Sequence, residues 1–166
     1  VDDGSKDDSW KKIIDISKRN PNTHGLRFLK NYGKSMALSA GFSESKGSIV
    51  ITMDADLQDD PNEIIPLYNM VKNECYDLVS GWKKKRYDSV IFKNIPSKLF
   101  NWAARKSSGI NLHDFNCGIK AYKKSVIKEI ELTGGMHRYI PVLAKNCGFN
   151  KISAVSYTHL RAHETV

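Results

Sequence analysis

Two aspartates, Asp54 and Asp56, stand two residues apart directly after a run of apolar residues, and Gln58 follows them. Carboxylates in this arrangement at the end of a strand can bind one divalent cation together with a diphosphate, and the Gln58 amide offers a third oxygen. The same acidic stretch also suits a solvated loop that caps the next helix, because Asp59 and Asp60 favour the positive end of a helix dipole. The short motif alone does not decide between a metal site and a capping loop.

The first residues carry a second acidic turn, Asp2-Asp3-Gly4. An aspartate at the end of a strand can accept hydrogen bonds from a nucleobase or a ribose hydroxyl, and glycine lets a ligand approach closely. An ordinary Asp-Gly turn explains the same residues. The nucleotide-binding interpretation gains weight because the motif at residues 54–56 also follows a predicted strand.

Basic residues dominate the charge of the chain, which is +8 at neutral pH. This charge predicts attraction to an anionic partner, whether nucleic acid, lipid headgroups or a phosphorylated substrate. Residues 83–86, beginning with Lys83, are all basic. Such a run is commonly a solvated loop, although each basic residue contributes about 1 kcal/mol at an anionic bilayer. A nucleic-acid-binding module is disfavoured, because acidic strand ends repel phosphates and the aromatic residues form no stacking platform.

A scaffold of alternating strands and helices must position these residues. The pattern predicts helices over residues 9–19, 33–45, 61–73, 96–106, 125–130 and 139–145, and strands over residues 26–29, 48–53, 76–80, 116–122 and 151–155. The alternation predicts an α/β fold with a mostly parallel sheet and helices on both faces. The strand at 48–53 is expected to be buried on both faces. Ligands bind beyond the carboxyl ends of such strands, where the sequence places Asp2, Asp3, Asp54, Asp56 and Lys83.

The composition fits one soluble globular domain, since the 166 residues are 40% hydrophobic and 27% charged. The longest apolar stretch, residues 49–53, is far shorter than the roughly 18 residues that a membrane span needs. Three cysteines without a CxxC pair disfavour both a disulfide framework and a zinc site. The cysteine pattern therefore favours a reducing, cytoplasmic setting.

Six segments of the chain follow one another in a recognisable order: VDDGSKDDS, NYGKSMALSAGF, ITMDADLQDDPNEI, GWKKKRYDS, PSKLFNWAARKSSG and DFNCGIKAY. Together they resemble glycosyltransferase family 2, in the polyprenyl-phosphate branch that includes relatives of dolichyl-phosphate mannosyltransferase and bactoprenol glucosyltransferase. The resemblance covers residues 1–155. It implies a GT-A fold, a nucleotide-sugar donor, Mg²⁺ or Mn²⁺, and direct transfer with inversion at the anomeric carbon.

The resemblance also implies a role for individual residues. It implies a nucleotide-sugar site that includes Asp2, Asp3, Asp54, Ala55, Asp56 and Lys83, and a metal site that includes Asp54, Asp56 and Gln58. Lys98 and Asp114 are the implied catalytic residues, matching a basic residue on a phosphate and an acidic residue beside the acceptor. Because a phosphate monoester is already ionised at neutral pH, Asp114 would position the acceptor or the sugar hydroxyls rather than remove a proton. The alternative is a turn aspartate that caps the next segment.

The expected function is transfer of a hexose from a UDP-sugar or GDP-mannose to undecaprenyl or dolichyl phosphate at the cytoplasmic face of the membrane. Residues 83–86 would contact the membrane surface, and no nucleic-acid partner is expected. A family 2 transferase with a soluble or polysaccharide acceptor is the alternative. Measured against the family pattern, the first strand is missing, so we expect a partial catalytic domain over residues 1–155 that is weakly active or inactive. Residues 156–166 depart from the pattern, and we expect a non-native or disordered tail there.

Overall fold

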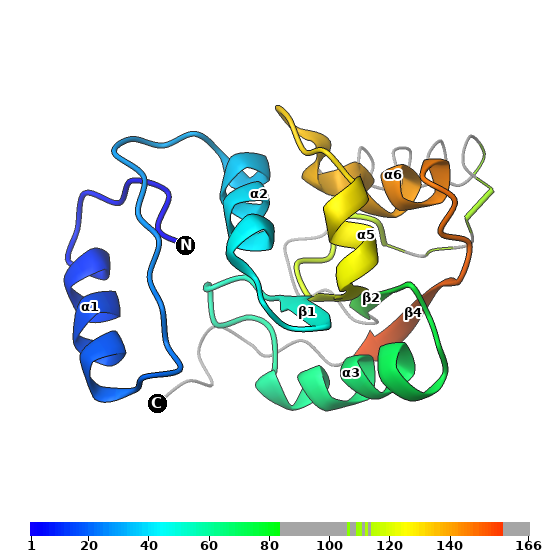
Figure 1. Ribbon diagram of the computed structural model, residues 1–166, viewed down its shortest axis with the longest axis horizontal. Coiled ribbons are helices and arrows are strands. Elements are labelled where there is room, and N and C mark those ends of the chain that lie inside the picture. The colour runs from blue at the N-terminus through cyan, green and yellow to red at the C-terminus, as the bar shows by residue number, and fades with distance from the viewer. Residues whose placement is uncertain (84–105, 107–108, 111, 113, 158–166) are drawn as a thin grey trace, which may run out of the picture. The chain divides into compact units, whose positions relative to one another are not determined.

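The computed structural model describes residues 1–83, 106, 109–110, 112 and 114–157, and its chain forms two compact units (Figure 1). The first unit comprises Val1–Lys46 and Glu131–His137, and the second comprises Gly47–Ile130 and Arg138–Val166. Several predictions lie outside the described residues: Lys98, the basic residues 84–86, most of the helix at 96–106, and the tail from residue 158 onward. The domain boundary after residue 155 stays a prediction.

The first unit contains two α-helices. Helix α1 (Ser9–Arg19) has Lys18 and Arg19 in its last turn, where basic side chains stabilise the negative end of the helix dipole. Helix α2 (Lys34–Glu44) begins after Gly33, whose φ of 90° is in a range that favours glycine. Both helices agree with the sequence prediction. The strand predicted at residues 26–29 is reduced to a single parallel bridge between Asp2 and Arg27.

Close contacts hold the first unit together. Helix α1 packs against the backbone at Gly25, where an added Cβ would lie 2.7 Å from the Ile13 side chain and 3.0 Å from that of Trp10. Ser35 is buried near the start of α2, and its Oγ accepts a hydrogen bond of 3.0 Å from the backbone N–H of His137. The second contact attaches residues 131–137 to α2 although about a hundred residues separate them in the sequence.

The second unit is built on a sheet whose described strands are β1 (Ile49–Thr52), β2 (Leu78–Lys83), β3 (Lys120–Lys123) and β4 (Ile152–Tyr157), in the order β1-β3-β2-β4. Strand β4 pairs with β2 in parallel, whereas β3 runs antiparallel to both β1 and β2. Three strands therefore point the same way and β3 is reversed. The expected mostly parallel sheet is confirmed, and the reversed strand is a feature that the alternating pattern did not predict.

Figure 1 shows helices on both faces of this sheet, as the sequence predicts, and apolar clusters pack on each face. The short 3-10 helix η1 (Pro61–Glu63) leads into α3 (Ile64–Asn73), whose Leu67 and Val71 pack on Val79 and Ala121. The other face carries Ile110, Leu112 and Phe115 with α6 (Ile140–Asn146), which follows the 3-10 helix η2 (Met136–Tyr139). Helix α5 (Lys124–Glu129) follows β3 directly.

Strand β1 is less buried than the sequence predicts. Each of its four side chains is partly exposed, whereas Leu78 and Val79 in the neighbouring part of the sheet are fully buried. The physical reason is its position, since β1 is the outer strand of the sheet among the described residues and has a strand on only one side. None of the helices that the structure describes is long and apolar enough to cross a membrane.

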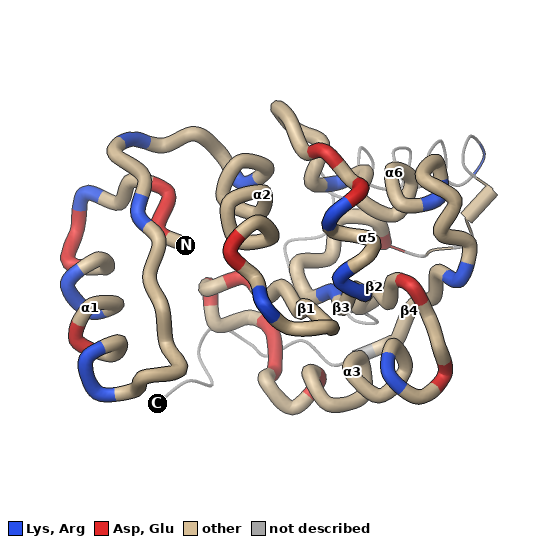
Figure 2. Tube along the Cα trace, viewed as in Figure 1, with Lys and Arg blue, Asp and Glu red and all other residues tan. Residues whose placement is uncertain are grey.

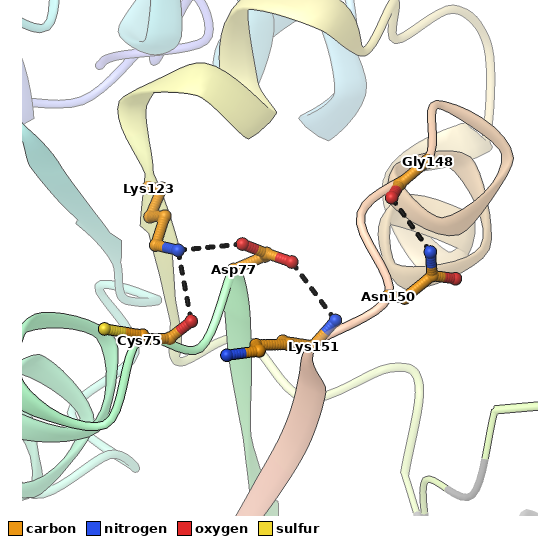
Figure 3. A network of polar contacts seen from close by, with 6 residues as sticks. All are labelled: Cys75, Asp77, Lys123, Gly148, Asn150 and Lys151. Atoms are coloured by element: carbon orange, nitrogen blue, oxygen red, sulfur yellow. Dashed lines mark hydrogen bonds and ion pairs between the residues drawn. The ribbon is translucent and has the colours of Figure 1, made fainter.

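A polar network fixes one edge of the sheet, where β2 and β4 begin and β3 ends (Figure 3). The two carboxylate oxygens of Asp77 accept hydrogen bonds from Lys123 Nζ at 2.9 Å and from the backbone N–H of Lys151 at 3.1 Å. Lys123 Nζ also donates to the carbonyl of Cys75 at 3.1 Å. The Asp77 carboxylate thus connects three strands at this edge of the sheet. The residues predicted to do chemistry lie at the opposite edge, after the end of β1 and before the start of β3.

Candidate active site

The carboxylate of Asp54 lies against Gly118, the residue two positions before β3. Asp54 is partly buried just after β1, and a Cβ added to Gly118 would come within 2.4 Å of its Oδ2 and 2.5 Å of its Cγ. No side chain fits at residue 118 unless Asp54 moves. The antiparallel direction of β3 creates this contact, because it brings the start of β3 to the same edge as the carboxyl end of β1.

Two side chains hold the backbone on either side of this contact. Thr52, the last residue of β1, donates its hydroxyl to the carbonyl of Gly118 at 3.0 Å. Lys120, which is 4% exposed, donates from Nζ to the carbonyl of Cys117. The segment that faces Asp54 is therefore fixed by hydrogen bonds from β1 and β3, and it limits the position of the carboxylate on one side.

Tyr122 of β3 is a buried residue next to Thr52. Its hydroxyl lies 3.4 Å from Thr52 Oγ1. Burial raises the pKa of Tyr122 above its ordinary value, and the charges of Cys117 and Asp54 add to the shift, while the hydrogen bond with Thr52 opposes it. The phenol is therefore neutral at physiological pH and acts as a hydrogen-bonding group.

Asp56 and Gln58 form a tight turn after Asp54. The backbone N–H of Gln58 donates to Asp56 Oδ1 at 3.1 Å. Leu57 between them has a φ of 60°, a left-handed conformation that costs a residue with a Cβ about 1 kcal/mol or more. Ala55 and Asp56 are exposed and Gln58 is partly buried. The turn keeps the Asp56 carboxylate at the surface beside the end of β1.

Capping of the next helix is carried out by a different aspartate. Asp60 Oδ1 accepts a hydrogen bond of 2.9 Å from the backbone N–H of Asn62 at the start of η1. Burial and the charge of Asp60 raise the pKa of Glu63, which lies in the same turn. The sequence left a metal site and a capping loop as alternatives for this acidic stretch. The described structure gives the capping role to Asp60, which leaves the metal site as the proposal for Asp54 and Asp56.

Asp114 lies on the segment that leads into β3. It is 4% exposed, and its Oδ1 accepts a hydrogen bond of 3.0 Å from the backbone N–H of Asn116. This local turn matches the structural alternative that the sequence left open. A role beside the acceptor stays a prediction for Asp114.

In the first unit, Asp2 is a buried acidic residue with one engaged oxygen. Its Oδ1 accepts a hydrogen bond of 2.8 Å from the backbone N–H of Ser5. Its Oδ2 lies 3.6 Å from Arg27 Nε and accepts no hydrogen bond among the described residues. Hydrogen bonds from the Ser5 hydroxyl and N–H lower the pKa of Asp2, the Arg27 charge contributes, and burial opposes the shift.

Asp3 and Gly4 hold the segment that precedes α2. The Asp3 carboxylate accepts hydrogen bonds from the backbone N–H groups of Tyr32 at 2.7 Å and of Gly33 at 2.9 Å. Gly4 has a φ of 73°, and a Cβ there would lie 2.5 Å from the carbonyl carbon of Lys30. Asp3 thus has a structural role that sequence reasoning missed, because its partners lie about thirty residues away. Contact of Asp2 or Asp3 with a nucleoside stays a prediction.

The predicted site residues fall in both units. Asp54, Ala55, Asp56 and Gln58 are consecutive parts of one turn in the second unit, and Lys83 is the last residue of β2 at the same edge of the sheet. Asp2 and Asp3 belong to the first unit. Sequence reasoning missed Thr52, Gly118 and Lys120, although a threonine in the otherwise apolar strand β1 is a signal that polar partners lie nearby.

Comparison with known proteins identifies relatives over most of the chain. The model of the family described as Glycosyl transferase family 2 matches residues 1–131. The dodecaprenyl-phosphate galacturonate synthase of Rhizobium johnstonii is 33% identical over 165 residues, covering 96% of this chain and 48% of that protein. The undecaprenyl-phosphate 4-deoxy-4-formamido-L-arabinose transferase of Shewanella sediminis is 36% identical over 161 residues, covering 96% of this chain and 47% of that protein. The chain thus spans about half the length of these relatives.

Solved structures show the same fold. The glucosyl-3-phosphoglycerate synthase of Mycobacterium tuberculosis in complex with Mn²⁺, UDP-glucose and phosphoglyceric acid matches with a TM-score of 0.67 at 20% identity, covering 97% of this chain and 59% of that one. A second structure of that synthase, with Mn²⁺ and UDP-glucose, matches with a TM-score of 0.65 at 20% identity, covering 96% of this chain and 58% of that one. The likeness at this identity shows a GT-A-like fold.

Proposed function

Because this chain belongs to glycosyltransferase family 2, we propose that it carries the donor-binding part of an enzyme that transfers a sugar from a nucleotide sugar to a polyprenyl phosphate. The names of two relatives, a dodecaprenyl-phosphate galacturonate synthase and an undecaprenyl-phosphate transferase, support the lipid-phosphate acceptor. Their sugars differ from one another, so a hexose from a UDP-sugar or GDP-mannose stays the expectation from sequence. The proposed place of reaction is the cytoplasmic face of the membrane.

The observation that carries this proposal is the fixed position of the Asp54 carboxylate against Gly118, next to the exposed carboxylate of Asp56. Asp54, Asp56 and Gln58 would hold the divalent cation, since carboxylate and amide oxygens are the ligands that Mg²⁺ and Mn²⁺ prefer. The described residues contain no group of three or more His, Cys, Asp or Glu that could hold a metal. The remaining ligands would therefore come from the nucleotide diphosphate and water. Mg²⁺ at phosphate sites is commonly bound in this way, by one or two carboxylates together with phosphate oxygens and water.

The cation, when bound, would neutralise part of the charge on the leaving diphosphate. The residues of the chain position it. A helix cap is supplied by Asp60, so neither Asp54 nor Asp56 is needed for that role. Hydrogen bonds from Thr52 and Lys120 fix the backbone that limits the movement of Asp54. A carboxylate held in place before the ligand arrives binds with less loss of conformational entropy.

Asp2 is the stronger candidate for contact with the nucleoside. Its Oδ2 accepts no hydrogen bond among the described residues but is buried 3.6 Å from Arg27 Nε, so a ribose hydroxyl or a base N–H would donate to it only after the residues that cover it move. Both oxygens of Asp3 already accept backbone hydrogen bonds, so Asp3 would contribute by shaping the segment before α2. Lys83 ends β2 at the edge where the diphosphate is proposed to bind.

On the acceptor side, we keep Lys98 and Asp114 as the proposed catalytic residues. Asp114 would position the acceptor phosphate or the sugar hydroxyls, and the hydrogen bond from Asn116 would orient its carboxylate. Lys98, which lies outside the described residues, would contact the lipid phosphate as a point charge. The basic residues 83–86 would lie near the membrane surface.

A transfer assay tests the function directly. A full-length version of the protein is incubated with a panel of nucleotide sugars and with undecaprenyl or dolichyl phosphate, and the lipid product is extracted and counted. We expect a lipid-linked sugar that forms only when polyprenyl phosphate is present. Transfer to a soluble or polysaccharide acceptor without consumption of polyprenyl phosphate would contradict the proposal. Tight, steeply salt-dependent binding to DNA or RNA with no transfer would do the same.

Two variants test the acceptor side. Lys98→Ala should impair transfer to the lipid phosphate more than hydrolysis of the donor, because its proposed partner is the acceptor. Asp114→Asn keeps the shape of the side chain and its bond with Asn116 but removes the charge. Unchanged transfer kinetics in both variants would remove these residues from the proposed mechanism.

A further inference from the structure

Residues 27–36 of the first unit, here named the basic–apolar loop, comprise a loop and the first three residues of α2 and expose large apolar side chains. The exposed fraction is 102% for Leu29, 54% for Tyr32 and 42% for Met36, so Leu29 is as open to solvent as in an isolated peptide. Burying such side chains is favourable in proportion to the apolar area removed from water. Several of them on ten consecutive residues indicate a surface with a partner, whereas single exposed apolar residues need no explanation.

The basic–apolar loop is fixed by contacts within its own unit. Asp3 binds the backbone N–H groups of Tyr32 and Gly33, and Gly4 packs tightly on the backbone at Lys30. The ring of Phe28 meets that of Tyr32 edge to face, with 5.5 Å between the ring centres. Leu29 and Tyr32 therefore project from an ordered backbone. A partner that buries them would not have to order the loop on binding.

The charge of the basic–apolar loop indicates the kind of partner. Residues 27–36 contain Arg27, Lys30 and Lys34 and no acidic residue, and Figure 2 shows basic positions along the segment that leads into α2. Lys30 Nζ lies 5.2 Å from the centre of the Tyr32 ring, which places a cation directly beside an exposed aromatic side chain. Asp3 is an acidic residue in contact with the loop, and its carboxylate is engaged with backbone N–H groups.

Helix α3 carries a similar surface with the opposite charge. Ile65 is 62% exposed, and Lys72 Nζ lies 5.3 Å from the centre of the Tyr68 ring. Glu63 and Glu74 flank these residues, so the segment 63–74 carries two acidic residues and one basic residue. An anionic surface would attract the basic–apolar loop and repel this part of α3. Comparing the basic–apolar loop with the segment 63–74 therefore distinguishes the effect of electrostatic attraction from that of exposed apolar side chains alone.

We propose that the basic–apolar loop docks on a bilayer that contains anionic lipids. Leu29 and Tyr32 enter the headgroup region, where tyrosine is favoured, and Lys30 and Lys34 contact lipid phosphates. The choice of a membrane as partner rests on the proposed function, whose acceptor is a membrane lipid. The contact is distinct from the one proposed for residues 83–86, since it lies in the other unit.

Binding of the chain to lipid vesicles tests this surface. The partition coefficient is measured by co-sedimentation, at low salt, with vesicles of phosphatidylcholine alone and of phosphatidylcholine with phosphatidylglycerol. Lys30→Gln should weaken binding to the anionic vesicles about fivefold, and Leu29→Ser about tenfold. The matched controls are Lys72→Gln and Ile65→Ser on α3, which remove the same kinds of side chain and should change binding less than twofold.

Any of three vesicle-binding results would overturn the proposal: no binding of the original chain to anionic vesicles, losses below twofold in both loop variants, or equal losses in the α3 controls. A change in the monomer–dimer equilibrium of Leu29→Ser in analytical ultracentrifugation, with vesicle binding unchanged, would assign the surface to a second copy of the chain and overturn it as well. None of these measurements involves sugar transfer. The docking surface and the proposed function can therefore fail separately.

Discussion

Replacement of Gly118 by alanine would push a methyl group into the carboxylate of Asp54. The added Cβ would lie 2.4 Å from Oδ2, 2.5 Å from Cγ and 3.0 Å from Oδ1. Non-bonded atoms pack at about 3.5 Å, so the carboxylate has to move by about 1 Å. The backbone at residue 118 cannot move instead without breaking its hydrogen bond with Thr52.

The expected effect is much larger on ligand binding than on stability. A displacement of about 1 Å at a reacting or binding group costs about 10²-fold, so the affinity for UDP or GDP with Mn²⁺ should fall by about 10- to 100-fold. Overpacking costs about 1–3 kcal/mol, and the low end is expected because the obstacle is the end of a partly buried side chain. The Gly118→Ala variant should therefore still fold but should bind the nucleotide poorly.

Two measurements on the same variant check this prediction. Calorimetric titration gives the affinity for the nucleotide, and urea unfolding gives the stability. Gly41→Ala is the control, because its Cβ would make an ordinary contact of 3.5 Å with Val1 and alanine stabilises a helix by about 0.5–1 kcal/mol relative to glycine. In an Asp54→Ala background, Gly118→Ala should cause no further loss of affinity, since the two residues act through one contact. A folded Gly118→Ala variant with affinity within twofold of the original chain would refute the reasoning.

Two further predictions concern stability. Asp77→Ala should lower the free energy of unfolding by about 1–3 kcal/mol, because Lys123 and the Lys151 N–H both lose a partner. The control in urea unfolding is Asp8→Ala, whose ion pair with Lys11 is exposed and which should cost less than about 0.5 kcal/mol. Equal losses of stability in the two variants would contradict this prediction. Because burial raises the pKa of Tyr122 from 10.0, the unfolded chain ionises this phenol first, so its contribution is complete below about pH 10 and falls by about 1.4 kcal/mol per pH unit above it. Tyr122→Phe should remove that part of the alkaline loss in urea midpoints, and an unchanged slope above pH 10 would contradict the assignment.

The helices could be predicted from local sequence patterns because their signals are local. Pro21 after α1, Gly33 before α2 and Pro61 at the start of η1 mark ends that the structure reproduces within a few residues. The direction of β3 could not be predicted in this way. Its residues, Lys-Ala-Tyr-Lys, are as compatible with one strand direction as with the other, and direction is set by where the chain enters the sheet.

The candidate site shows the same division. The positions of Asp54 and Asp56 after β1 follow from the sequence pattern, and so does the cap at Asp60, although the pattern did not tell these roles apart. The contact of Gly118 with Asp54 joins residues 64 positions apart, and that of Asp3 with Tyr32 and Gly33 joins residues about thirty apart. Such contacts depend on how the strands pair, so no local pattern signals them.

Calorimetric titration with UDP and with GDP, in Mn²⁺, in Mg²⁺ and in EDTA, tests the central claim that Asp54 and Asp56 hold a cation for the nucleotide diphosphate. The informative variant is Asp56→Asn, because it removes the charge and keeps an acceptor for the N–H of Gln58. Asp15→Asn on α1, in the other unit, is the control for the loss of one negative charge. The account predicts that a divalent cation strengthens binding of at least one nucleotide, and that Asp56→Asn abolishes this effect while Asp15→Asn preserves it. Equal binding in EDTA, or metal-dependent binding that survives in Asp56→Asn, would contradict it.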